Sequence, residues 1–262
     1  MQKRVRVRRD RPSALSWALA LAVTMLAVYL VTLSAPAVIP EAEEAGAPAA
    51  RVTRELTLAG TAAYLVDLGV HPDGTAARIA AANFAQRGAA GVVLPRDDGF
   101  HVIGACYENE ADAARIAQRL SAQEIPAGTL TLSAQAVSLR ITAPESDADA
   151  IAEADRALRS ALCQAGALAL QIDRGENSAS QARTLAAVAR SELDRAERQL
   201  AQVAGAEEQR VCAGLLTIMR RVSQGLSGTA KGSAAGATLS GQLRCIQTDG
   251  TLELIAFLSE LS

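Results

Sequence analysis

The chain has 262 residues and a formal net charge of −2, and it is 50% hydrophobic but only 3% aromatic. This length allows one or two domains, and the nearly neutral charge excludes a generally basic nucleic-acid-binding protein. The 57 alanines favour helices that pack closely through small faces, whereas seven aromatic residues and two histidines are a poor supply for a large catalytic pocket.

The first 35 residues have the pattern of a membrane anchor. Residues 1–12 form a basic tail with six Lys or Arg side chains, and residues 13–35 follow without a charge. Because about 20 apolar residues can cross a bilayer, residues 13–35 are predicted to be a transmembrane helix. The positive-inside rule then predicts a single-pass protein of the cell membrane, with a cytoplasmic N-terminus and extracytoplasmic C-terminal domains. A cleaved signal peptide is the alternative, since Ala35-Pro36-Ala37 fits a cleavage site.

The next two segments differ in composition and pattern. Residues 36–60 are rich in Pro, Ala and Glu and are interpreted as an acidic linker. Residues 61–143 alternate strand and helix patterns. The predicted elements are a strand at 63–70, a helix at 75–86, strands at 91–95 and 100–104, a helix capped by Asn109, and strands at 129–133 and 136–142. The order β-α-β-β-α-β is that of a ferredoxin-like split βαβ domain, with both helices on one face of the sheet and the other face free.

Residues 144–262 have helical patterns throughout. The predicted helices begin at Ser146, at Ser178 or Ser180, at about Glu207 and at Leu239. Residues 225–241 are rich in Gly, Ser and Ala and are predicted to be a flexible loop. Apolar stripes with polar backs indicate a helical bundle or a helical surface that binds partners in an oligomer. The predicted fold class is therefore α+β, with an N-terminal transmembrane helix, a βαββαβ domain and an all-α bundle.

One segment of the βαββαβ region resembles a known family. Residues 100–120 have an aromatic-led strand, a glycine, an aromatic turn and a capped helix, carried by Phe100, Gly104, Tyr107, Asn109, Ala113, Ala117 and Leu120. This pattern is similar to the second half of a SPOR (sporulation-related repeat) domain, and residues 64–88 repeat it with Gly69 and Ala77. The resemblance implies non-enzymatic binding of peptidoglycan glycan strands stripped of stem peptides, across the free face of the sheet. It also implies localisation to the septum in cell division or sporulation.

The resemblance leads to a set of candidate glycan-binding residues. They are Tyr64, Asp67, Phe100, His101 and Tyr107. Asp67 stands where the family often carries Gln, so it offers sugar hydroxyls an acceptor but no amide donor. Core packing is an equal alternative for each tyrosine and for Phe100. A one-residue slip in the third strand would exchange the residues of the two faces, so the register of His101 stays open.

Other functions find little support in the sequence. No nucleophile motif or metal-ligand spacing is present, so we expect no enzyme activity, no cofactor and no metal. The cysteines Cys106, Cys163, Cys212 and Cys245 permit either disulfides or free thiols. The expected partners are peptidoglycan glycan strands, the membrane and an envelope or division protein that binds the helical region, but no nucleic acid. The alternative function is a membrane-anchored helical scaffold that binds envelope proteins without binding glycan.

Overall fold

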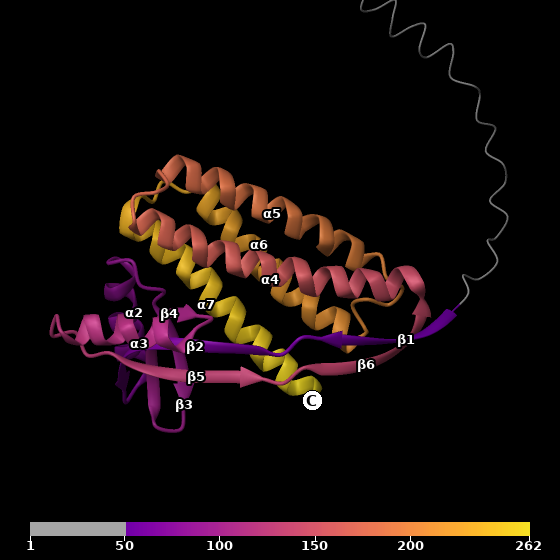
Figure 1. Ribbon diagram of the computed structural model, residues 1–262, viewed down its shortest axis with the longest axis horizontal. Helices are drawn as coiled ribbons and strands as arrows, with labels where there is room; N and C mark the ends of the chain where they lie inside the picture. The colour runs from indigo at the N-terminus through magenta and orange to yellow at the C-terminus, as the bar shows by residue number, and fades with distance from the viewer. Residues whose placement is uncertain (1–50) are drawn as a thin grey trace, which may run out of the picture. The chain divides into compact units, whose positions relative to one another are not determined.

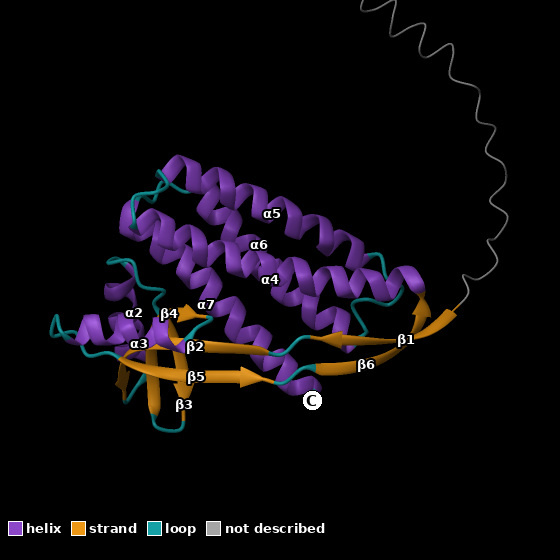
Figure 2. Cartoon of the chain, viewed as in Figure 1, coloured by secondary structure: helices purple, strands orange, loops and turns teal. Residues whose placement is uncertain are grey.

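The computed structural model describes residues 51–262. This part of the chain is α+β, with six helices and two sheets (Figures 1 and 2). The strands are β1 (Arg51–Leu58), β2 (Thr61–His71), β3 (Val92–Arg96), β4 (Gly99–Tyr107), β5 (Gly128–Ala134) and β6 (Val137–Pro144). The helices are α2 (Gly74–Ala85), α3 (Glu110–Ser121), α4 (Glu145–Asp173), α5 (Ala179–Ala201), α6 (Arg210–Lys231) and α7 (Gly236–Leu261).

The predicted membrane anchor is corrected. No helix within residues 51–262 is both long enough and apolar enough to cross a membrane. The predicted transmembrane helix at residues 13–35, and the basic tail before it, lie outside the described residues. The prediction of a fold that begins with this helix is therefore withdrawn. The single-pass localisation depended on the helix and is withdrawn with it.

Residues 61–134 follow the expected order of elements. The four-stranded sheet has the order β3-β4-β2-β5, and all neighbouring strands are antiparallel. Helices α2 and α3 pack on one face, over a core of Val66, Leu68, Ala77, Ala81, Val102 and Ala113. Local signals explain both helices, because Asp73 and Asn109 accept hydrogen bonds from the first backbone N–H groups of α2 and α3.

The opposite face of the sheet is not free, contrary to the prediction. Helix α7 contacts all four strands and also packs against α4 and α6 (Figure 1). Ala63, Leu65 and Ile103 point to this side and join the large core of the bundle. A helix placed between a sheet and other helices needs apolar residues around its whole circumference. The sequence of α7 fits this position, because its buried residues lie on several sides of the helix rather than on one stripe.

A two-stranded ribbon extends the sheet. Strands β1 and β6 pair antiparallel over their full length and continue from β2 and β5. Strand β1 falls at the end of the segment interpreted as an acidic linker, and its pattern did not predict a strand. At the joint between the two pairs, a Cβ on Gly60 would lie 2.9 Å from the carbonyl oxygen of Ala134, so the ribbon needs glycine there.

Helices α4 to α7 form a bundle in which α4 contacts the other three. The predicted loop at 225–241 is wrong, because α6 continues to Lys231 and α7 begins at Gly236. Glycines in these helices mark close packing instead of a loop. A Cβ on Gly225 would lie 2.8 Å from Ile246, and one on Gly250 would lie 2.5 Å from Leu162.

Candidate functional site

The structure separates the five predicted glycan-binding residues. Tyr64, Phe100 and Tyr107 are half-buried on the α2/α3 side of the sheet, where they pack around its smaller core. Asp67 and His101 contact each other instead. The five residues therefore do not form one flat binding face.

His101 lies between two carboxylates. Its side chain is 3% exposed, and its Nδ1 lies 2.8 Å from Oδ2 of Asp67 while its Nε2 lies 2.9 Å from Oδ1 of Asp98. Asp67 also accepts a hydrogen bond of 3.0 Å from the N–H of Gly69 through its other oxygen. Ionised carboxylates only accept, so both bonds form together when His101 is an imidazolium. This cluster ties the β3–β4 hairpin to β2.

The pKa values follow from this geometry. Burial alone would lower the pKa of His101, but the hydrogen bonds with Asp98 and then Asp67 raise it, and the net pKa lies above its usual value of 6.5. The pKa of Asp98 is lowered, chiefly by its hydrogen bond with His101. Both shifts indicate that the ionised forms of His101 and Asp98 stabilise each other.

The stability of the fold should therefore depend on the ionisation of His101. A raised folded-state pKa means that His101 contributes its full stabilisation below the unfolded pKa and loses it as pH rises through the folded pKa. We expect the gap in unfolding free energy between the natural chain and His101→Gln to be largest below the usual pKa of 6.5 and to shrink as the pH rises through the raised folded-state pKa. Urea unfolding at several pH values measures the gap, and His71→Gln is the matched control. A gap that stays constant or widens would contradict the assignment.

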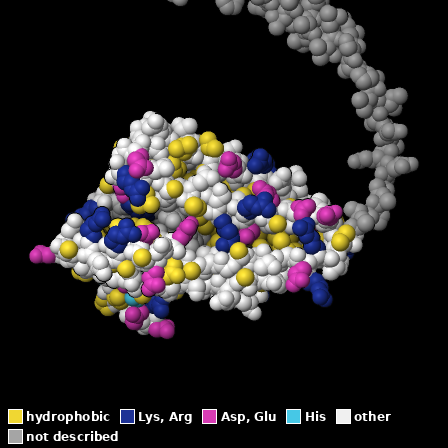
Figure 3. Space-filling view, viewed as in Figure 1, with side chains coloured by type: hydrophobic (Ala, Val, Ile, Leu, Met, Phe, Trp, Pro, Cys, Tyr) yellow, Lys and Arg dark blue, Asp and Glu magenta, His cyan; other side chains and the backbone are white. Residues whose placement is uncertain are grey.

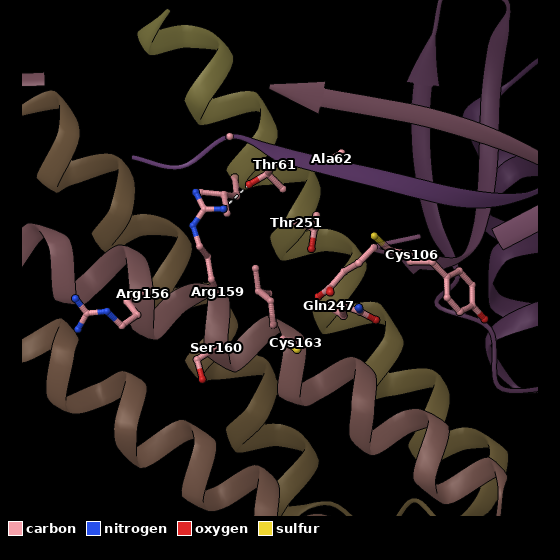
Figure 4. Close-up of a pocket in the computed structure, with 14 residues that line it drawn as sticks. Thr61, Ala62, Cys106, Arg156, Arg159, Ser160, Cys163, Gln247 and Thr251 are labelled. Carbon is pink, nitrogen blue, oxygen red and sulfur yellow. Dashed lines mark hydrogen bonds between the residues drawn. The ribbon is translucent and has the colours of Figure 1, made fainter. Parts of the chain in front are cut away.

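A groove lies where the start of β2 and the end of β4 meet α4 and α7 (Figure 4). It consists of two adjoining cavities with volumes of about 520 and 290 Å³. The residues that line both cavities are Cys106, Tyr107, Glu108, Cys163 and Gln247. Figure 4 shows Gln247 and Thr251 on α7 opposite Ser160 and Cys163 on α4. We refer to this feature as the β4–α4–α7 groove.

Two arginines hold the walls of the groove together. Arg159 of α4 bonds the carboxylate of Asp155 at 3.0 Å, the hydroxyl of Thr61 at 2.5 Å and the carbonyl of Ala59 at 2.5 Å. Arg159 thereby ties α4 to the joint between β1 and β2. At the other end, Arg244 of α7 donates to the carbonyl of Gly88 at 2.6 Å and to the carboxylate of Asp173. The groove is thus a rigid junction between the sheet and the bundle.

Most charges in the groove are already neutralised. Of the charged residues that line it, Arg156, Arg159 and Arg244 each pair with a carboxylate, and Asp112 pairs with Arg115. Basic and acidic side chains are also interspersed over the face of the molecule seen in Figure 3. Glu108 is an exception, because within residues 51–262 it has no arginine or lysine partner. The groove therefore offers neutral hydrogen-bonding groups and one free carboxylate.

The thiols in the groove are protonated at neutral pH. Burial raises the pKa of Cys106 to about 12, against a hydrogen bond with Thr251 that lowers it. The pKa of Cys163 is raised by burial and then by Glu108. All four cysteines are free in the structure. Protonated thiols are weak nucleophiles, so Cys106 and Cys163 act as small apolar contacts in the groove.

Sequence reasoning included only one residue of this groove, Tyr107, among its candidates. Glu108 and Gln247 were missed, as was the role of Arg159. Glu108 directly follows the aromatic turn of the resemblance, which was an available signal. Gln247 lies about 140 positions further along the chain, and only the docking of α7 brings it to the site.

Comparison with known proteins gives no match to a family model, a curated protein or a solved structure. Within residues 51–262 no group of three His, Cys, Asp or Glu side chains is placed to hold a metal ion.

Proposed function

We propose that the protein binds peptidoglycan glycan strands without catalysing a reaction on them, and that the β4–α4–α7 groove is the binding site. The observation that carries this proposal is the lining of the groove, where uncharged donors and acceptors lie next to Tyr107. The resemblance implies that the glycan binds across the free face of the sheet, but α7 covers this face. We therefore propose the groove as the binding site.

The chemistry of the lining suits a sugar chain. Sugars present many neutral hydroxyl groups and a few apolar C–H faces, so they need hydroxyl, amide and carboxylate partners with aromatic surface nearby. Thr251, Ser160 and Gln247 supply neutral polar groups, and Tyr107 supplies a half-buried ring. Two adjoining cavities also suit a linear ligand better than a compact one.

This proposal includes a cellular role. The resemblance to SPOR domains implies that the ligand is a glycan strand without stem peptides and that the protein localises to the septum. A protein that binds them would gather where peptidoglycan is remodelled, in division or sporulation.

Co-sedimentation of the full chain with whole sacculi tests the proposal. We expect binding that rises after an amidase has removed the stem peptides. Ser160→Trp should reduce this binding at least about tenfold by filling the groove from α4. Ser191→Trp, on the exposed side of α5, is the matched control and should bind normally. Absence of binding to either preparation would overturn the proposal, and so would release of muropeptides by the chain.

A protein-binding scaffold is the second candidate. Leu185 and Val188 on α5 are 44% and 49% exposed and lie three positions apart, so they share one face of the helix. A pair of exposed large apolar side chains is a small potential contact for another protein. If the protein is such a scaffold, Leu185→Asp should weaken its complex with the partner protein, whereas Ser160→Trp should leave that complex unchanged.

A further inference from the structure

We infer that Glu108 and Gln247 form a subsite for the acetamido group of an N-acetylated amino sugar. This inference rests on the proposed glycan binding and assigns its specificity to two residues. Glu108 follows β4, and Gln247 lies on α7, on the opposite wall of the groove. Both residues line both cavities, so they lie at the point where the cavities meet.

The neighbouring polar groups are already engaged. Arg159, Arg244 and Arg156 each bond a carboxylate, and Asn109 caps α3 with its side-chain oxygen. Among residues 51–262, the Gln247 amide makes no hydrogen bond within the protein, and the Glu108 carboxylate has no arginine or lysine partner and lies near the thiols of Cys163 and Cys106. The unengaged groups are therefore one strong acceptor and one amide.

These two groups match an acetamide. The N–H of the acetamide would donate to the Glu108 carboxylate, and its C=O would accept from Nε2 of Gln247. The acetamide methyl needs a small apolar contact, which Cys106 and Leu254 offer on the same lining. The amide of Gln247 packs directly over Gly166, where a Cβ would lie 2.4 Å from Nε2, so only glycine leaves room for the amide there.

The net charge of the subsite adds selectivity. The other charged groups in this part of the groove are paired with groups of opposite charge. Glu108 therefore remains as a single negative charge. A ligand carboxylate close to Glu108 would be repelled, whereas a neutral N-acetyl group would not. The subsite should therefore take the N-acetylated sugar that carries no acid group.

Calorimetric titration of the full chain compares two probes. One probe is a tetramer of N-acetylglucosamine, and the other is the same tetramer without acetyl groups. We expect the acetylated tetramer to bind at least about tenfold more tightly, because only it completes both hydrogen bonds. Equal affinities, or tighter binding of the deacetylated tetramer, would overturn the subsite.

Two variants locate the effect. Glu108→Gln and Gln247→Glu keep the size of the side chain but remove the acceptor charge or the donor, and each should weaken binding of the acetylated tetramer about tenfold. Glu208→Gln, an exposed change away from the groove, should have no effect. Unchanged melting temperatures would show that the variants fold.

The two proposals fail differently. If the natural chain binds stripped sacculi and both variants bind the tetramer as well as it does, the acetamido subsite is wrong and the glycan function stands. If the natural chain binds neither sacculi nor tetramer, both proposals are wrong.

Discussion

Arg159→Met is expected to lower the free energy of unfolding by about 3 kcal/mol, because it leaves a buried carboxylate without its partner. The side chain of Asp155 is 12% exposed, and both of its oxygens bond Arg159 at 3.0 Å. The same substitution also removes the donors to Thr61 and to the carbonyl of Ala59. Helix α4 would thus lose one of its polar attachments to the ribbon along with a paired charge, while the pair between Arg54 and Asp149 would remain. Urea denaturation followed by circular dichroism measures the loss.

A double variant separates the two causes. In Arg159→Met with Asp155→Leu, the buried charge is gone, so most of the lost stability should return. Arg156→Met is the control on the same helix. Its side chain is 71% exposed in the pair with Glu153, so removing it should change stability by less than about 0.5 kcal/mol. If the double variant is no more stable than Arg159→Met alone, the penalty comes from the lost hydrogen bonds to Thr61 and Ala59 and not from Asp155.

The local order of elements could be predicted from the sequence, because the signals for it are local. Alternating strands and the cap Asn109 act within a few residues, and the structure has them where expected. The covered sheet face could not be predicted in the same way. It depends on α7 docking from more than 100 positions away, and a sequence pattern does not show which partner a helix buries.

The glycines of the bundle explain the largest error in the helical region. Glycine disfavours a helix by about 1 kcal/mol relative to alanine, so a segment rich in it is predicted to be a loop. Gly225, Gly241 and Gly250 nevertheless lie inside helices, where a Cβ would come within 3 Å of a neighbour. Close packing between helices offsets the intrinsic cost, and that gain is visible only once the neighbours are known.

The positions of the predicted glycan-binding residues were harder to predict because they depend on strand register. The pairing of β2 with β4 shifts between Val66 and Asp67 and again between Asp67 and Val70. These irregularities place Asp67 and His101 within hydrogen-bonding distance, as part of a buried ion pair. A bulge of this kind has no clear signal in one sequence. For the same reason, the aromatic residues of the resemblance could not be assigned to a face.

Gly241→Ala should destabilise the protein by about 2 kcal/mol, although alanine favours a helix more than glycine does. A Cβ at this position would lie 2.9 Å from the carbonyl oxygens of Ala85 and Ala89. Both atoms belong to the backbone, so neither can move aside as the end of a side chain would. The substitution would push α7 away from the loop after α2, where Arg244 also bonds Gly88.

Gly228→Ala makes the same chemical change where no neighbour is close. Gly228 lies inside α6, and a Cβ there would have no atom of another residue within 4 Å. This variant should gain about 0.5 to 1 kcal/mol through helix propensity. Opposite signs for the two glycines, measured by urea denaturation under one set of conditions, would show that α7 is held by backbone contact with the sheet domain. A stabilising Gly241→Ala would mean that α7 can shift freely along the sheet.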